Sequence, residues 1–181
     1  MNQDRYILVR PTMAHVSELV ALRDEFASHG GEVYGCGDLM SCEGEEAVAN
    51  WVHRCELAEL EEHVPVGSVP ITQFVCERAA TGELVGVIQV RRRFNDYYEK
   101  YAGNIGYAVR PAARRQGVAR WMLTAMLDFC RDDIGLDRVL LLCRDYNEAS
   151  RRTILACGGV YESTVLRPTD GMNMERYWIE L

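Results

Sequence analysis

The sequence lacks both an excess of positive charge and any long hydrophobic run. Its 20 Lys and Arg residues are outnumbered by 27 Asp and Glu, which gives a net charge of −7. Bulk attraction to nucleic acid or to an anionic membrane is therefore not expected. No apolar run approaches the roughly 20 residues that a membrane helix needs. The first residues show no basic segment followed by an apolar one, so we expect no signal peptide.

Cysteine spacings typical of metal or redox sites are also absent. The seven cysteines form no Cys-x-x-Cys pair, and several, such as Cys76, Cys130 and Cys143, lie in apolar runs where cysteine behaves as a small buried hydrophobe. This usage predicts a reduced, cytoplasmic protein. The four histidines lack ligand spacing with the cysteines, so we expect no metal.

The composition that remains is that of one globular domain. The chain has 181 residues, of which 48 % are hydrophobic and 26 % charged, and a chain of this length buries about 70 % of its surface on folding. No linker, repeat or low-complexity tract interrupts residues 1–181, so we expect one domain.

Charge is unevenly distributed along the chain. Residues 1–62 carry 4 basic and 13 acidic groups, whereas residues 110–152 carry 9 basic and 6 acidic groups. The acidic part indicates either solvated helix faces or a site for a cationic partner. The basic part indicates either solvated surface or a place for an anionic ligand.

Hydrophobic periodicity predicts the order βααβββαβαββ and an α+β domain around a mixed sheet. The glycine-rich residues 30–42 are expected to form a flexible loop over or beside a site. Gly103 and Gly106 indicate a bulge or a close backbone approach in a strand. We expect helices at 12–29, 45–62, 117–133 and 147–157, and strands at 5–10, 71–78, 84–93, 104–109, 138–143, 160–165 and 174–179.

The segment 105–123 carries the clearest chemical signal. It is expected to form a strand, a tight turn and a helix, and the first amides of a helix have no acceptor within it. Gly117 removes the side chain that would keep a phosphate from those amides. Arg114, Arg115 and Arg120 add positive charge nearby. We therefore interpret this turn as an anion site; it matches neither the Walker A nor the dinucleotide pattern.

The same residues resemble the acetyl-CoA signature of the GNAT superfamily of N-acetyltransferases. Val109-Arg110-Pro111 is followed by Arg114-x-x-Gly117-x-Ala119 and an amphipathic helix. Downstream, residues 138–143 and 147–152 are similar to the fifth strand and the Asn-x-x-Ser/Ala-Arg helix start of that family. Within the family, the chain is similar to a bacterial group of predicted acetyltransferases. The resemblance implies a mixed, mostly antiparallel sheet flanked by helices, with splayed central strands.

The resemblance also implies roles for particular residues. The backbone of Val109 would pair with the pantetheine arm of acetyl-CoA, the co-substrate, and Asn147 and Ser150 would line its wall. A primary amine of a small molecule or peptide would attack the thioester directly in a ternary complex. Relatives are often dimers, so a homodimer is compatible with this reading. The amides expected to hold the pyrophosphate are those of Arg115, Gln116, Gly117, Val118, Ala119 and Arg120.

The catalytic acid and base do not follow the family pattern. Many relatives place a carboxylate early in the fourth strand, where this chain has Gly103-Asn104, and a tyrosine where it has Ile154. This departure keeps a second interpretation open, that of an inactive acyl-CoA-binding sensor. A base acting through water is a further alternative. Our candidate catalytic residues are Tyr107 on the strand, Asp96 and Glu99 on the loop before it, and Glu32 on the glycine-rich loop.

Each of these candidates has an ordinary structural alternative. Tyr107 would pack, Glu32 would be solvated, and Asp96 and Glu99 would pair with nearby basic residues. The triplet Arg91-Arg92-Arg93 is expected to be solvated or paired rather than to bind nucleic acid.

Overall fold

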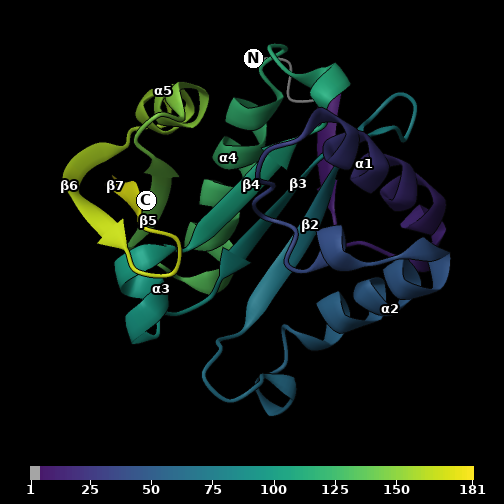
Figure 1. Cartoon of the computed structure of the whole chain (residues 1–181), viewed down its shortest axis with the longest axis horizontal. Helices are drawn as coiled ribbons and strands as arrows, with labels where there is room; N and C mark the ends of the chain where they lie inside the picture. The colour runs from purple at the N-terminus through teal and green to yellow at the C-terminus, as the bar shows by residue number, and fades with distance from the viewer. Residues whose placement is uncertain (1–4) are drawn as a thin grey trace.

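Two antiparallel sheets make up the β structure of the protein (Figure 1). The computed structural model describes residues 5–181. Residues 1–4 of the expected domain, which belong to the segment examined for a signal peptide, lie outside the described part. The first sheet has the order β1 (Tyr6–Val9), β2 (Ile71–Arg78), β3 (Leu84–Arg91), β4 (Ile105–Val109). The second has the order β5 (Arg138–Arg144), β7 (Met172–Glu180), β6 (Val160–Arg167).

Helices cover both faces of the first sheet. Figure 1 shows α1 (Val16–His29) and α2 (Gly44–Leu57) over one face and α4 (Val118–Phe129) over the other. The helix α5 (Glu148–Ala156) lies beside the second sheet, and the short α3 (Asp96–Tyr101) lies next to β6. This arrangement confirms the α+β class and the mostly antiparallel sheets flanked by helices.

The hydrophobic core is divided between these two faces. Leu22, Phe26 and Trp51 pack on the α1 and α2 side, and Met122 and Met126 pack on the α4 side. Every residue of β3 from Leu84 to Val90 is buried, because a strand with helices on both faces has no solvated side. Trp51 is a buried packing residue, and its indole Nε1–H donates to the Cys36 carbonyl at 3.0 Å.

The two sheets meet at one corner and separate beyond it. The buried Asn104 donates its amide N–H to the Leu140 carbonyl at 2.7 Å, and its side-chain oxygen accepts from the Leu140 amide at 2.8 Å. Gly103 forms an isolated bridge with Leu141. Past this corner β4 and β5 belong to different sheets, so the expected splayed strands are present.

The sequence placed two segments differently from the structure. The helix expected to reach residue 62 ends at Leu57, because the next carbonyl, that of Ala58, accepts instead from the Ile71 amide at 2.9 Å. Asp96 and Glu99 lie on the helix α3 and not on a loop. This helix is capped by Asn95, whose side chain accepts from the Tyr98 amide, a signal that was available in the sequence.

The corner between the sheets requires a glycine at position 103. A Cβ on Gly103 would lie 2.4 Å from the Leu140 oxygen, whereas Gly171 has nearly the same backbone angle, φ 69° against 70°, and open space around it. Both alanine variants incur about 1–2 kcal/mol of backbone strain. We expect Gly103→Ala to lower the free energy of unfolding by a further 1–3 kcal/mol or so through overpacking.

Urea denaturation of both variants measures this difference. Equal destabilisation of Gly103→Ala and Gly171→Ala would contradict the close approach of the two sheets.

Candidate active site

A cavity of about 1060 Å³ opens where the two sheets separate. This volume lies near the upper end of the range for small-molecule sites, about 300–1,000 Å³. Its walls come from β4, the start of α4, the first turns of α5, part of α3 and the glycine-rich loop. The expected loop beside a site is thus present at residues 30–35.

The turn between β4 and α4 presents a row of unpaired backbone donors to this cavity. Within residues 5–181, the amide N–H groups of 115 to 120 donate to no oxygen of the chain, and the first paired amide is that of Trp121. Gly117 has φ 83° and a Cβ there would meet no atom within 4 Å. Arg115 also has a positive φ, 62°, which non-glycine residues rarely adopt. The turn therefore holds a strained shape that leaves its amides unobstructed.

Positive side chains surround these amides. Arg115 and Arg120 line the cavity, and Arg114 does so while donating from Nε to the Val109 carbonyl at 3.2 Å. The Gln116 side chain is turned away, because it donates to the Ala112 carbonyl and accepts from Arg78. Only its amide remains for a ligand.

One edge of β4 is open toward the cavity. Arg110 donates to the Val85 carbonyl and Asn104 accepts from the Arg91 amide, both at 2.8 Å, so alternate residues of β4 bond to β3. The intervening residues, Tyr107 and Val109, direct their backbone groups to the opposite edge, where β5 has departed. An extended ligand can pair with this edge as an added strand would.

Tyr107 directs its side chain toward α5. Its hydroxyl lies 3.0 Å from the Ser150 hydroxyl, and burial raises the pKa of Tyr107 to about 12. The phenol therefore stays protonated at neutral pH and serves as a hydrogen-bond donor. Ser150 and Asn147 both line the cavity, and the Asn147 side chain also caps α5 by accepting from the Ser150 amide at 3.1 Å.

The glycine-rich loop is fixed at two points beside the site. A Cβ on Gly35 would lie 2.2 Å from the Gly106 oxygen, so these two backbones approach as closely as glycine allows. Farther along the loop, Glu32 forms an ion pair with the buried Arg144, which also donates to Tyr34 at 3.1 Å. Sequence reasoning missed Tyr34 and Arg144, because their contact joins residues 110 positions apart.

The structure brings together most of the predicted site residues but not all of them. Glu32 and Tyr107 line the cavity, as do Val109, Asn147, Ser150 and the turn residues, apart from Gln116. Asp96 and Glu99 instead line a separate surface depression with Glu162 and Arg176. Neither residue is among those that line the large cavity beside β4.

Comparison with known proteins places this architecture in a family. The family model described as "Acetyltransferase (GNAT) domain" matches residues 5–160. The chain belongs to the GNAT acetyltransferase family. Among curated proteins, none matches the chain by sequence.

Solved structures share the fold of this GNAT domain at low sequence identity. Mycobacterium smegmatis RimJ in complex with CoA-disulfide is 20 % identical with a TM-score of 0.75, over 97 % of this chain and 81 % of that one. The microcin C7 self-immunity acetyltransferase MccE, in complex with acetyl-CoA and AMP, is 14 % identical with a TM-score of 0.74, over 98 % and 93 %. A Salmonella typhimurium acetyltransferase that modifies the N-terminal serine of ribosomal protein L7/L12 is 15 % identical with a TM-score of 0.73, over 98 % and 95 %.

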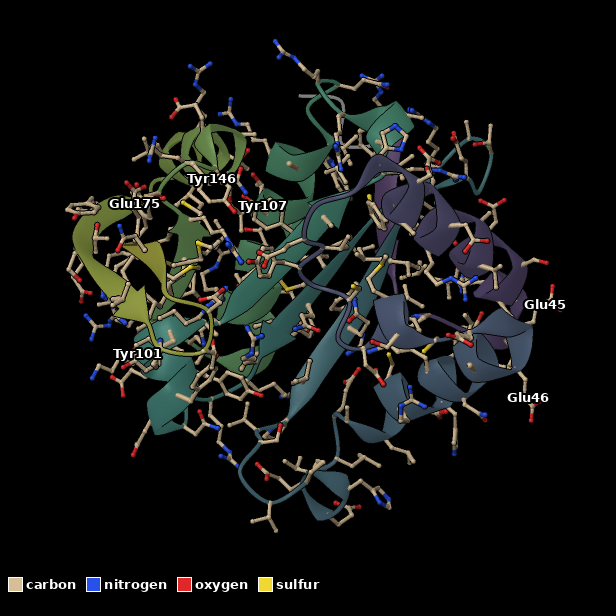
Figure 2. All side chains as sticks on the ribbon, in the orientation of Figure 1. Glu45, Glu46, Tyr101, Tyr107, Tyr146 and Glu175 are labelled. Carbon is tan, nitrogen blue, oxygen red and sulfur yellow. The ribbon has the colours of Figure 1, made fainter. Side chains whose placement is uncertain are left out.

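The structure answers two questions from the sequence about this GNAT domain: whether a helix could span a membrane, and where the acidic residues lie. Among residues 5–181, no helix is both long enough and apolar enough to cross a bilayer. Most acidic residues from position 5 to position 62 are exposed, and Figure 2 shows Glu45 and Glu46 at the outer rim of α2, away from Tyr107. Among the acidic residues from position 5 to position 62, Glu32 alone lines the cavity.

In the GNAT domain, a partly buried ion pair holds the chain just before the amide turn. The Glu25 carboxylate on α1 accepts from Arg110 Nε at 2.6 Å and from the Ala112 amide at 2.9 Å. Partial burial alone would raise the pKa of Glu25, but these hydrogen bonds outweigh it and lower the pKa overall. Sequence reasoning missed this pair, since its members lie 85 residues apart.

We expect Glu25→Gln to lower the free energy of unfolding by about 1.5–3 kcal/mol at pH 7, the contribution of a hydrogen bond to a charged group. Because the folded pKa is depressed, this stabilisation is present above the ordinary value of 4.5 and is lost as the pH falls through the folded pKa. Denaturant titrations from pH 7 to pH 3 measure the difference from the native protein.

Glu18→Gln is the matched control, since Glu18 contacts the same Arg110 at 3.3 Å but is half exposed. A Glu25→Gln difference that persists unchanged at pH 3, or an equal effect of Glu18→Gln, would contradict this assignment.

Proposed function

We propose that this protein transfers the acetyl group of acetyl-CoA to a primary amine by direct attack in a ternary complex. The observation that carries the proposal is the row of unpaired amides at 115–120, which opens into the same cavity as the free edge of β4. The two features together suit a ligand with a diphosphate at one end and an extended amide-containing arm at the other.

The turn would hold the diphosphate of CoA. Backbone N–H groups at a helix start attract phosphate through both hydrogen bonds and the helix dipole. Gly117 leaves room for the phosphate oxygens, and Arg114, Arg115 and Arg120 supply additional positive charge. None of these contacts needs a large rearrangement, because the amides are already free of internal partners.

The open edge of β4 would align the pantetheine arm. Val109 offers its amide N–H there, since β3 bonds to the residues on either side of it. The arm would leave the turn at the end of β4 and run back along the strand toward Tyr107. A backbone amide beside the thioester would polarise its carbonyl, as a one-donor oxyanion site does.

Tyr107 is our candidate for the proton donor to the departing thiolate. Its phenol is neutral at physiological pH and its hydroxyl faces the cavity wall formed by Ser150. Glu32 is the one proposed carboxylate that lines the cavity, but Arg144 and Tyr34 bind it. Because these partners already occupy the Glu32 oxygens, we propose that the amine loses its proton to water.

The cysteine in the cavity favours direct attack over an acyl-enzyme route. Burial, followed by the neighbouring Glu175 carboxylate, raises the pKa of Cys143 to about 12. Glu175 stays ionised because Arg151 binds it at 2.8 Å and lowers its pKa. A thiol in this setting is a poor nucleophile, since the thiolate is the reactive form. Cys143, like the other cysteines, is unpaired, which suits a cytoplasmic enzyme.

The structural neighbours act in different biological settings. One structural neighbour modifies a ribosomal protein N-terminus and another gives immunity to a microcin. Acceptors of different chemistry are therefore served by one fold. Both a small-molecule amine and a peptide N-terminus are compatible with the open cavity of about 1060 Å³.

We expect Gly117→Glu to abolish acetyl-CoA binding while the fold is retained. The new carboxylate would occupy the phosphate position, and losing two charge-assisted hydrogen bonds at about 1.5–3 kcal/mol each predicts affinity about a hundredfold lower or worse. Calorimetric titration with acetyl-CoA measures the change. For the native protein, ligand at about 100 times its Kd should add roughly 2.7 kcal/mol of stability.

The matched control is Gly135→Glu, at the far end of the same helical segment. Gly135 has φ 77° and open space around it, so the strain and the added charge are similar while the amide turn is untouched. Unchanged affinity in Gly117→Glu, or equal loss in Gly135→Glu, would refute the assigned diphosphate site.

We expect Tyr107→Phe to reduce kcat by at least about tenfold, because the substitution removes a general acid. The affinity for acetyl-CoA should change little, because the amide turn at 115–120 is left intact. Product formation with a panel of amines, followed by mass spectrometry, gives kcat. Tyr161→Phe removes a hydroxyl from the exposed outer surface of β6 and serves as the control. A native protein that binds acetyl-CoA but acetylates no amine would instead be the acyl-CoA-binding sensor.

A further inference from the structure

Three consecutive arginines at the end of β3 lie in different environments. Arg92 is near Glu59 at 3.8 Å, and Arg93 forms an exposed ion pair with Glu61 at 3.1 Å. These two agree with the expectation of solvated or paired charges. Arg91 does not: among residues 5–181, no Asp or Glu oxygen lies within 4.0 Å of its guanidinium.

Arg91 is enclosed rather than solvated. Its Nη1 donates to the Gly103 carbonyl at 3.1 Å, and its guanidinium carbon lies 4.6 Å from the centre of the Tyr98 ring. Its Nε is buried and has no acceptor within the described part of the chain. One carbonyl and one aromatic face are thus the partners of a full positive charge.

An enclosed charge without a counter-ion is energetically costly. Burial lowers the pKa of the Arg91 guanidinium, and the nearby Tyr98 only partly opposes this. Guanidinium groups stay charged in proteins, and the half-buried Arg91 makes one side-chain hydrogen bond within the described residues, so a partner with acceptor oxygens would stabilise it. Arg91 lines the large cavity, which is where such a partner can enter.

The position of Arg91 lies beyond the reacting end of the acyl donor. Its amide bonds to the Asn104 carbonyl, at the start of β4, whereas the amide turn follows Val109 at the other end. The five residue steps from Asn104 to Val109 span roughly 17 Å of strand. A pantetheine arm that enters along β4 from the turn therefore points its thioester toward the end of the cavity that holds Arg91.

Other charged groups at this end neutralise one another. Arg144 is paired with Glu32 and with Asp170 at 3.0 Å, and Arg167 also binds Asp170. Arg91 is thus left as the unbalanced charge, next to the Tyr97, Tyr98 and Tyr101 side chains of α3 that line the same part of the cavity. Figure 2 shows Tyr101 on α3, well apart from the acidic face of α2 marked by Glu45 and Glu46.

We propose that Arg91 binds an anionic group, a carboxylate or a phosphate, carried by the acceptor amine at the end remote from its nitrogen. The guanidinium matches the planar oxygen pairs of these groups. The acceptor site accordingly selects amines that also bear a negative charge and disfavours polyamines. This inference rests on the proposed acetyl transfer and adds the substrate class to it.

The experiment compares acceptors that differ only in this charge. Carboxylate and amide forms of the same amine, such as 4-aminobutyrate and 4-aminobutanamide, or the C-terminally amidated dipeptides Gly-Glu-amide and Gly-Gln-amide, are assayed with acetyl-CoA. An aminoalkyl phosphate and a diamine complete the panel. We expect kcat/KM to be at least about tenfold higher for the anionic member of each pair, or about 1.4 kcal/mol. Comparing kcat/KM for the carboxylate and phosphate acceptors identifies the preferred anion.

Three variants assign the preference to Arg91. Arg91→Met should bring the anionic-to-neutral ratio close to one, and Arg91→Lys should restore part of it by keeping the charge. Arg93→Met removes the same charge from the exposed neighbour and should leave the ratio as in the native protein. Calorimetric binding of acetyl-CoA to each variant establishes that the fold is retained.

The thermal shift that each amine adds to CoA-loaded protein gives a readout independent of turnover. Equal kcat/KM and equal shifts for the paired acceptors would overturn the inference, as would a preference for the diamine or a preference that survives in Arg91→Met. Acetyl-CoA that fails to bind would refute the proposed function instead. In that case, the thermal shifts that the anionic and neutral amines give with the free protein test Arg91 separately. A larger shift for the anionic amine would support anion binding by Arg91, and equal shifts would overturn it.

Discussion

Asn104 ties the two sheets together at one corner, and the cavity exists because they separate beyond it. Its backbone and side chain both bond to Leu140, which fixes β4 against β5 at their closest point. From there β4 keeps β3 as its partner and has an unpaired outer edge. Backbone groups without internal partners must meet water or a ligand, so this separation creates a binding edge.

The rest of the site is arranged to keep that edge and the amide turn in position. Glu25 holds Arg110 and the Ala112 amide immediately before the turn, and Gly35 packs against Gly106 on the face of β4 that α1 and α2 cover. The strained backbone at Arg115 is tolerated because these neighbouring contacts fix the chain on the side of β4. Positioning here comes from long-range contacts, while the ligand-binding groups themselves belong to the backbone.

Local electrostatics matter more in this protein than its net charge of −7. The acidic groups of the N-terminal third point mostly to solvent, as the faces of α2 show (Figure 2). The cavity has positive side chains at the amide turn and an unbalanced Arg91 at the opposite end. A ligand in the cavity experiences these nearby groups with little screening, whereas the outer charges are screened within about 10 Å of solvent.

The order of strands and helices, apart from α3, could be predicted from the sequence, and so could the turn at 114–120. These features depend on short-range patterns: apolar periodicity, a glycine at a helix start and clustered arginines. The sequence also suggested Tyr107 and Glu32, both of which reach the cavity, and Asp96 and Glu99, which do not. Tertiary structure alone decided the pairing of Glu32 with Arg144, of Glu25 with Arg110, and the isolation of Arg91 from its two neighbours. These outcomes depend on which distant segments meet, and a charged residue has the same appearance in a sequence whether its counter-ion is near or absent.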